Sequence, residues 1–290
     1  MTTNKYTILK DSAFFEIKGS DRELFLQGLI TNDIFQCTKN ISIYSAFLSP
    51  QGKFIADFFI INLGQSFLLE TKNKFIDDLI IKLNFYKLRA DVKINKIDSF
   101  YSIAIYERNH LFNNLRENGD TEKLDSGYIL VDPRKKLMGL KAFIKKEMLE
   151  KFIIKYSLSK DKYENYNKKR ILNIIPDSIL DLKINKSVLL ENNFNSINAI
   201  SWNKGCYVGQ EITARMKYRA LIKKSIMKIS LIKGKIKSDD EIFFENKKIG
   251  YMCSVDENIG LAMLNIIDAK NLSENNKILN TKNGAIKIQI

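Results

Sequence analysis

The chain has 290 residues and a mass of 33.6 kDa, a length that corresponds to about two domains. Hydrophobic residues make up 45% and charged residues 28%, which excludes a disordered chain and predicts a globular protein with a buried core. The 47 Lys and Arg residues exceed the 33 Asp and Glu residues by 14, a balance that favours anionic partners without distinguishing nucleic acid, a polyanionic ligand and an acidic protein. A low-GC coding bias toward Lys, Asn and Ile explains the same charge as well.

The few cysteines and the single histidine argue against several kinds of site. Cys37, Cys206 and Cys253 lie far apart with no C-x-x-C pair, so no disulfide framework or structural zinc site is expected and a reducing compartment is favoured. His110 stands alone in a polar stretch and is interpreted as a surface residue, not as part of a triad or metal site. No signal peptide is recognised, and no apolar run reaches the ~18 residues of a membrane helix. We therefore expect a soluble, cytoplasmic protein.

The N-terminal part alternates strand and helix patterns. Residues 14–17 predict a strand, and Ser20 with Glu23 three residues later predicts a capping box for a short helix. The core face of this helix is expected to carry Leu24, Phe25, Gly28 and Leu29. Residues 44–48 and 54–63 flank a Pro- and Gly-containing turn, which indicates a hairpin.

The middle of the chain continues as mixed α and β. The expected elements are a strand at 67–70, a helix at 75–89, strand character over 92–105, a solvent-facing helix and loop at 109–126, strands from 128 and at 140–144 around a turn at 132–134, and a helical stretch from 145 to about 175. The fold class is therefore α+β.

The C-terminal part has a different texture. Short strand-like runs, separated by turns, occur at 226–232, 241–244, 248–254 and 260–264. Several short strands with regular turns are typical of a small β-barrel. We expect two domains, residues 1–224 and residues 225–290.

A polar, glycine-containing segment from Trp202 to Glu211 carries the strongest chemical signal. Gly205 and Gly209 flank Cys206 and permit tight turns or the close approach of a ligand. Nearby cations such as Lys204 and Arg215 would favour the reactive thiolate if they point toward it. The alternative is a cysteine buried as a small hydrophobic residue in a turn.

Residues 204–211, with the sequence KGCYVGQE, resemble the K-G-C-Y-x-G-Q-E signature of the YgfZ family. This family comprises folate-binding, GcvT-like relatives of the glycine-cleavage T-protein that are associated with iron–sulfur cluster assembly and repair. Further similarities lie at 27–33, 51–53, 57, 86–89, 132–134, 175–177 and 260–264. The resemblance covers nearly the whole chain and implies a GcvT-like folate-binding fold of interleaved α+β subdomains with a small C-terminal β-barrel.

The resemblance also implies the site. It marks Cys206 as the residue on which the family depends, tetrahydrofolate or a derivative as the cofactor, and iron–sulfur assembly proteins and their client enzymes as partners, without a membrane. The implied cofactor-binding residues are Asp57, Glu191, Trp202, Lys204, Gly205, Tyr207, Gly209, Gln210, Glu211 and Arg215.

Two acidic positions bear on folate binding and on aminomethyl transfer. Glu191 is similar to the acid that faces the pterin ring in T-proteins, where a carboxylate accepts two hydrogen bonds; the alternative is an ordinary surface glutamate. Amine-transferring T-proteins carry two adjacent acids after the hairpin, whereas this chain has Ala56 and Asp57. The missing acid argues against aminomethyl transfer.

The leading hypothesis is therefore a folate-binding accessory protein for iron–sulfur cluster assembly, insertion or repair. A folate-dependent one-carbon transferase is the first alternative. An RNA-binding or tRNA-modification factor is the second, because a run of cations follows the motif and could hold folate glutamates or RNA phosphates; a solvated face explains the same run. The run consists of Arg215, Lys217, Arg219, Lys223 and Lys224. Trp202 either stacks on a flat ligand or packs in the core.

Overall fold

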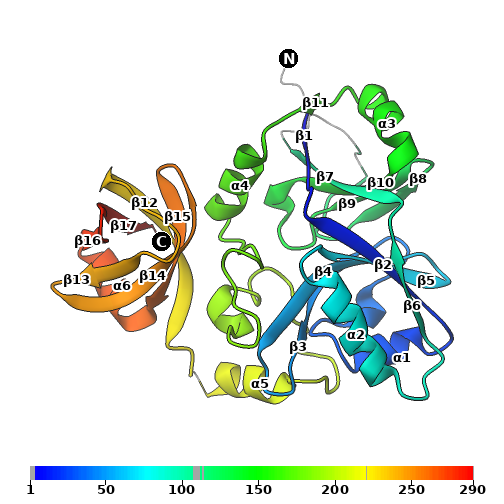
Figure 1. Cartoon of the computed structure of the whole chain (residues 1–290), viewed down its shortest axis with the longest axis horizontal. Coiled ribbons are helices and arrows are strands. Elements are labelled where there is room, and N and C mark those ends of the chain that lie inside the picture. Colours follow the sequence, from blue (N-terminus) through cyan, green and yellow to red (C-terminus); the bar gives the residue numbers. More distant parts are fainter. Residues whose placement is uncertain (1–3, 107–111, 113, 220, 290) are drawn as a thin grey trace.

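The computed structural model describes residues 4–106, 112, 114–219 and 221–289, so the surface position expected for His110 lies outside the described part. Two open β-sheets form one body, and a closed β-barrel stands beside it (Figure 1). Helix α4 (Tyr163–Leu172) lies between the body and the barrel. The mixed α+β class and the C-terminal barrel are confirmed.

The first sheet has five strands, all antiparallel to their neighbours. Their order is β3 (Ile43–Leu48), β4 (Phe54–Asn62), β5 (Ser66–Lys72), β2 (Ser12–Lys18) and β6 (Lys93–Ile97). The predicted hairpin is β3 and β4. Helices α1 (Arg22–Gln27) and α2 (Ile76–Lys87) lie beside this sheet, at the bottom of the view in Figure 1.

The second sheet has six strands. Their order is β11 (Ser159–Lys160), β1 (Lys5–Ile8), β7 (Phe100–Tyr106), β10 (Leu140–Lys145), β9 (Gly127–Val131) and β8 (Thr121–Leu124). Helix α3 (Leu149–Lys155) packs beside β10. Short 3-10 turns occur at Ile34–Gln36, Lys136–Met138, Lys146–Met148 and Leu189–Asn192.

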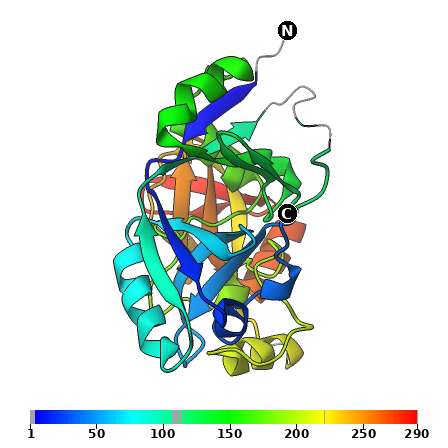
Figure 2. The ribbon, with the colours of Figure 1, turned by 90° about the vertical axis from the view of Figure 1, so that its right-hand side faces the viewer.

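The barrel closes through the order β12 (Lys224–Gly234), β15 (Ile259–Asn265), β14 (Lys247–Asp256), β13 (Glu241–Phe244), β16 (Leu279–Asn280) and β17 (Gly284–Gln289). Helix α5 (Gln210–Tyr218) precedes it, and α6 (Ile266–Glu274) connects β15 to β16. Figure 2 shows the body from the side opposite the barrel, with the two sheets stacked one above the other.

Three sequence predictions are wrong in detail. The strand pattern at 92–105 is two strands in different sheets, β6 and β7, because the chain turns at Asp98 and Ser99. The helical stretch at 145–175 is α3, β11 and α4. The capping box does not form, because the Ser20 amide and hydroxyl both donate to the Asp91 carboxylate, at 3.1 and 3.0 Å.

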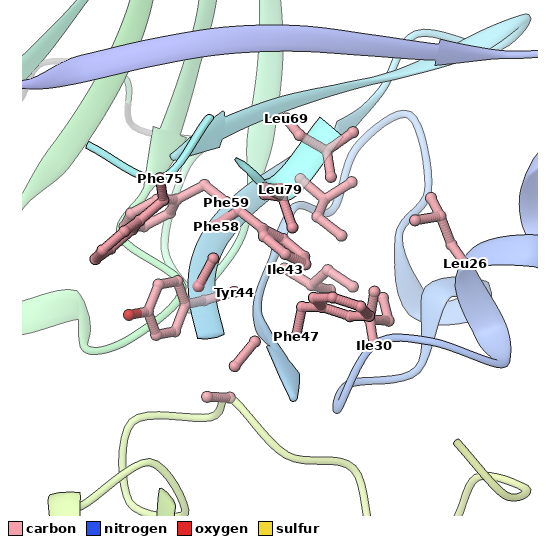
Figure 3. Packing of buried hydrophobic residues seen from close by; sticks show 14 of the residues in the cluster. Leu26, Ile30, Ile43, Tyr44, Phe47, Phe58, Phe59, Leu69, Phe75 and Leu79 are labelled. Carbon is pink, nitrogen blue, oxygen red and sulfur yellow. The ribbon is translucent and has the colours of Figure 1, made fainter. Parts of the chain in front are cut away.

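The core face of α1 is also shifted from the predicted one. Leu24 is 72% exposed and Gly28 is exposed, whereas Phe25, Leu26, Leu29 and Ile30 are buried. The buried positions keep the spacing of one helix face, and Gly28 still has right-handed helical dihedrals. The buried face is therefore rotated by about one residue from the predicted one. Figure 3 shows Leu26 and Ile30 pointing toward the aromatic side chains of β3 and β4.

Aromatic side chains fill the core between the sheets. Phe14 of β2 and Phe143 of β10 meet edge to face at 5.0 Å and so join the two sheets. Tyr44 and Phe59 contact each other at 4.9 Å on this side of the first sheet, whereas Phe47 lies on its other side, against Tyr86 of α2. Burial of one such ring contributes about 1.5–3 kcal/mol, which makes this cluster the main support of the body.

A buried polar network attaches the barrel to the body. Arg170 of α4 is 1% exposed and donates to Asp181 Oδ2 at 3.0 Å and to Ser254 Oγ of β14 at 2.5 Å. Asp181 Oδ1 in turn accepts the Ser254 amide at 2.6 Å. Every charge in this network is paired, as a buried arginine requires.

Candidate functional site

A cavity of about 770 Å³ opens between the two sheets and α4, within the ~300–1,000 Å³ usual for small-molecule sites. Phe59 of β4 and Tyr163 and Tyr166 of α4 supply aromatic wall. Charged side chains reach it from β4, β5, β10, α4 and the segment 176–178. The cavity is therefore assembled from parts of the chain that are distant in sequence.

One face of the first sheet forms the floor. Phe59 lies opposite Glu70, and Ser12 lies opposite Lys72. Because side chains alternate along a strand, Asp57 shares the cavity face with Phe59, and both line the cavity. The floor thus carries a carboxylate, a phenyl ring and an ion-paired lysine side by side.

Asp57 is the carboxylate with unused hydrogen-bonding capacity. It is 9% exposed, and its Oδ2 accepts a 2.5 Å hydrogen bond from the Tyr44 hydroxyl. Its Oδ1 is buried and makes no hydrogen bond within the described part of the chain. Burial raises the pKa of Asp57, against the opposing effects of Tyr44, Ser178 and Lys72. A ligand that offers an N–H donor here would satisfy Oδ1.

Ala56, which stands where amine-transferring T-proteins carry a second acid, does not face the cavity. Ala56 is fully buried in the hydrophobic core, on the face of β4 opposite Asp57. An acid at position 56 would point into the core of this sheet and not into the cavity. The cavity therefore keeps its carboxylate, and Ala56 does not count against folate chemistry in this chain.

Two ion pairs lie in the cavity wall. Lys72 Nζ lies 2.9 Å from Asp177 Oδ2, and Lys141 Nζ lies 3.1 Å from Glu70 Oε2. Burial opposes the charge of Asp177, but Lys72 and Arg170 keep its pKa below the usual range. Asp177 and Lys72 are thus both charged, and Asp57 remains the acid without a cationic partner in direct contact.

The sequence signature lies outside this cavity. Cys206 is exposed, so the interpretation of a buried structural cysteine is wrong. The described residues of the 202–211 segment do not line the cavity. Gly205, next to Cys206, has no atom within 4 Å of the position that a Cβ would take. The thiol is therefore presented to solvent with open space beside it.

Lys204 anchors the loop that presents Cys206. Its ammonium donates to the carbonyl oxygens of Gln27, Ile30 and Asn32 at 2.8, 2.7 and 2.9 Å. Burial lowers its pKa to about 8, and Asp33 acts in the opposite direction, so the ammonium is retained at neutral pH. Lys204 positions the loop and does not point at the thiol as the sequence suggested.

The far end of the loop is anchored by glycine. Gly209 has φ +81°, and a Cβ there would lie 2.4 Å from Ser49 O and 3.1 Å from Gly52 Cα. The loop thus packs on the β3–β4 turn. Gln210 Oε1 accepts the Tyr207 amide at 3.2 Å, and Tyr207 is buried. These residues of the signature hold the loop in shape.

Helix α5 continues the surface beyond Cys206. Glu211, Arg215 and Lys217 are exposed, as are the other cations of the basic run. Lys217 Nζ lies 3.7 Å from the ring centroid of Trp202, whose indole N–H donates to Asn195 Oδ1 at 2.7 Å. Trp202 is half-buried, and the ammonium of Lys217 already occupies one face of its ring.

Glu191 lies outside the cavity and close to helix α5. It lies on the 3-10 turn Leu189–Asn192, which contacts α5 and β12. Burial raises its pKa, and Lys224 and Lys53 oppose this shift. It does not line the cavity. Of the predicted cofactor-binding residues, Asp57 alone reaches the cavity, and most of the others surround Cys206.

Sequence reasoning missed the cavity cations and their partners. Glu70, Lys72 and Lys141 were not predicted as site residues, and Asp177 was noted only within the family similarity at 175–177. A signal was present, because Glu70 and Lys141 interrupt apolar strand patterns and both are buried. A charged residue inside a strand that is otherwise apolar is uncommon unless it is paired.

Comparison with characterised proteins identifies the relatives. No family model matches the chain. It is 28% identical over 254 residues to the iron–sulfur cluster assembly factor IBA57 homolog, mitochondrial, of Dictyostelium discoideum, covering 76% of this chain and 61% of the relative. It is 26% identical over 242 residues to the corresponding Mus musculus protein, covering 77% and 65%. The matched region thus spans about three fifths of these relatives.

A solved structure shows the same fold. Aminomethyltransferase T of the glycine cleavage system from Bartonella henselae superposes with a TM-score of 0.80 over 100% of this chain and 86% of that chain, at 10% identity. At this identity the likeness establishes the fold alone.

The comparisons correct one expectation and support another. The cytoplasmic location expected from the sequence is wrong, because the curated relatives are named mitochondrial. No helix among the described residues is long and apolar enough to cross a membrane. The chain is similar in sequence to proteins named IBA57 iron–sulfur cluster assembly factors and has the fold of aminomethyltransferase T, which agrees with the resemblance of its motifs to the YgfZ family.

Proposed function

We propose that this chain assists iron–sulfur cluster assembly, insertion or repair through Cys206, and that its cavity binds a tetrahydrofolate. The observation that carries the first part is the exposed thiol on a loop anchored at both ends, by Lys204 and by Gly209. The proposal that the transferred group is an iron–sulfur cluster comes from the names of the sequence relatives. An exposed thiol on an anchored loop suits transfer between proteins, because no opening of the chain is needed to reach it.

The cluster is a shared cargo in this proposal. Iron–sulfur clusters usually take about four protein ligands, whereas Cys206 is one thiol and Cys37 and Cys253 are buried far from solvent. Burial raises the pKa of both buried thiols, which disfavours the ligating thiolate. A partner protein therefore supplies the remaining ligands, and Cys206 offers one ligand across the contact.

The residues of the cavity fit a tetrahydrofolate. The orphaned Asp57 Oδ1 matches the amino and ring N–H donors of a pterin. The rings of Phe59, Tyr163 and Tyr166 match its flat face. Lys10, Lys160 and Lys162 line the cavity and are exposed at its rim, where they can pair with the carboxylates of the glutamyl tail.

Each group has a separate task in this arrangement. Tyr44 fixes the orientation of the Asp57 carboxylate through its short hydrogen bond, so that Oδ1 is the acceptor offered to the ligand. The Lys72–Asp177 pair beside it keeps the local charge balanced. Tetrahydrofolate, when bound, supplies the capacity to carry one-carbon units.

Aminomethyl transfer of the T-protein type remains the second candidate. It is favoured by the position of Ala56 on the core face of β4, since the cavity retains Asp57. Incubation of the protein with tetrahydrofolate and an aminomethyl donor tests it. Formation of methylenetetrahydrofolate that disappears in Asp57→Asn supports this candidate, and folate binding without product retires it.

An RNA partner, predicted from the charge of the chain, depends on the exposed cations of α5 and the residues after it. Phosphate contacts produce a steep fall of affinity with salt. Titration of a tRNA mixture at two salt concentrations tests this: affinity that does not change with salt, or that survives Arg215→Ala and Arg219→Ala together, counts against RNA binding.

The main experiment replaces the gene by a Cys206→Ala version and measures iron–sulfur enzyme activities under oxidative stress, at matched protein levels. Asn203→Ala, an exposed change in the same loop, is the matched control. We expect Cys206→Ala to resemble the deletion and Asn203→Ala to resemble the wild type. Full activity with Cys206→Ala would sink the proposal.

A further inference from the structure

Lys141 is a cavity residue with hydrogen-bonding capacity to spare. It lies on β10, is 3% exposed, and lines the cavity. Its ammonium carries three N–H donors. The acceptor that engages it among the described residues is Glu70, at 3.1 Å, and its remaining close contact is the Phe59 ring, 4.2 Å from Nζ to the centroid.

The other cation at this ring is already occupied. The Arg134 guanidinium lies 4.8 Å from the Phe59 centroid. It donates to both oxygens of Asp132, at 3.0 and 2.7 Å, and to the Tyr166 hydroxyl at 3.1 Å. Lys141 is therefore the donor above Phe59 that a ligand can use.

Glu70 holds Lys141 in this position. Its Oε1 accepts a 2.5 Å hydrogen bond from the Ser12 hydroxyl, which leaves Oε2 for the lysine. Glu70 is 4% exposed. A buried carboxylate fixed by a hydroxyl and an ammonium has little rotational freedom. Glu70 therefore holds the Lys141 ammonium in a fixed position at the cavity wall.

The spacing to Asp57 defines a pattern. Phe59 lies directly opposite Glu70, so Asp57, two residues earlier on β4, is the diagonal neighbour of Glu70 on the same face. Diagonal neighbours across antiparallel strands lie about 7–8 Å apart. The cavity thus presents an acceptor at Asp57 on its floor and, above the Phe59 ring, a donor at Lys141 of β10.

We propose that Lys141, positioned by Glu70, determines ligand specificity by donating to the 4-oxo oxygen of a pterin whose neighbouring N–H donors meet Asp57. This inference rests on the proposed folate binding. An oxo group accepts from an ammonium, whereas an amino group at the same ring position places donor against donor. A site with a buried donor rejects the analogue that leaves it unpaired.

The test uses two probes that differ at ring position 4 and, as a consequence, at the adjacent N3. Folic acid carries a 4-oxo group and a hydrogen on N3, whereas aminopterin carries a 4-amino group and no hydrogen on N3. Calorimetric titration of the full chain with each probe gives the ratio of the two dissociation constants. We expect the wild type to prefer folic acid by about tenfold or more.

Variants then assign the preference to a residue. Lys141→Met should weaken folic acid and lower the preference for it, because the share of the preference due to the N3–H donor at Asp57 remains, while Lys141→Arg should keep the full preference. Lys141→Met leaves Glu70 buried without its cation, so Lys141→Met with Glu70→Gln provides a second form that removes the charge of both partners. Asp57→Asn measures the share of the preference that comes from the N3–H donor, because Lys141 stays in place in this variant.

The outcomes separate the two levels of the proposal. Equal affinity of the wild type for both probes overturns the specificity role of Lys141 and leaves folate binding intact. A preference that is undiminished in both methionine forms overturns it as well. A wild type that binds neither probe overturns folate binding itself, and the inference with it.

Discussion

Replacement of Gly209 by alanine should destabilise the protein and loosen the loop that presents Cys206. Gly209 adopts φ +81°, and an added Cβ would lie 2.4 Å from Ser49 O and 2.9 Å from Leu48 Cβ. The backbone at Ser49 belongs to the turn that leads into β4, so it cannot move without disturbing the strand that carries Asp57.

The magnitude follows from two terms. A left-handed conformation costs a non-glycine residue roughly 1–2 kcal/mol, and overpacking against fixed backbone costs roughly 1–3 kcal/mol more. The sum is about 2–5 kcal/mol. At roughly 2–4 °C per kcal/mol for a chain of this size, the Tm should fall by on the order of 10 °C.

Gly205→Ala is the matched control in the same loop. Its Cβ would meet no atom within 4 Å, and Gly205 is not among the glycines with positive φ. We expect its Tm to stay within about 2 °C of the wild type, because alanine also restricts the unfolded chain slightly. Differential scanning calorimetry of both variants measures the contrast. Equal Tm values for Gly205→Ala and Gly209→Ala would refute the anchoring role of Gly209.

The remaining predictions concern three buried groups. Arg170→Met leaves Asp181 buried without its cation and should cost about 3–5 kcal/mol in urea unfolding; Arg170→Met with Asp181→Leu should recover part of it, and no recovery would contradict the pairing. Because burial raises the pKa of Asp57 in the folded state above 3.8, the wild type should lose stability relative to Asp57→Asn as pH rises from that value through the raised pKa, with a constant difference above it; a difference that shrinks with pH in urea titrations would show the opposite shift. Lys204→Met removes the donor of three carbonyl oxygens and should speed hydrogen exchange over 202–208 at neutral pH; unchanged exchange would show that the loop is held elsewhere.

Local patterns predict the local parts of this fold well. The β3–β4 hairpin follows from the Pro and Gly of its turn, and α2 follows from its apolar spacing. The closed barrel follows from short strands with regular turns. In each case neighbouring residues in the sequence decide the structure.

The long-range parts could not be read in the same way. The Lys204 ammonium is engaged by carbonyl oxygens of residues 27–32, which are far away in the sequence. The strand pattern at 92–105 does not show that β6 and β7 join different sheets. Leu24 is exposed because the sheet above α1 meets the helix face that carries Phe25, Leu26, Leu29 and Ile30.

The candidate site shows the same division. The signature indicated Cys206 and the loop around it, because its residues are contiguous. The cavity residues come from β4, β5, β10 and α4, and only the folded sheets bring Glu70 beside Lys141. The resemblance implied that the signature residues hold the ligand, whereas the structure separates the cavity from the cysteine loop.

We propose that the cavity and the cysteine loop are two separate sites of this chain. Calorimetric titration of the full chain with 5-formyltetrahydrofolate, for the wild type, Asp57→Asn and Cys206→Ala, tests it most directly. We expect Cys206→Ala to bind like the wild type and Asp57→Asn to bind at least about tenfold more weakly. Loss of binding in Cys206→Ala with retention in Asp57→Asn would contradict the separation and place the ligand at the loop.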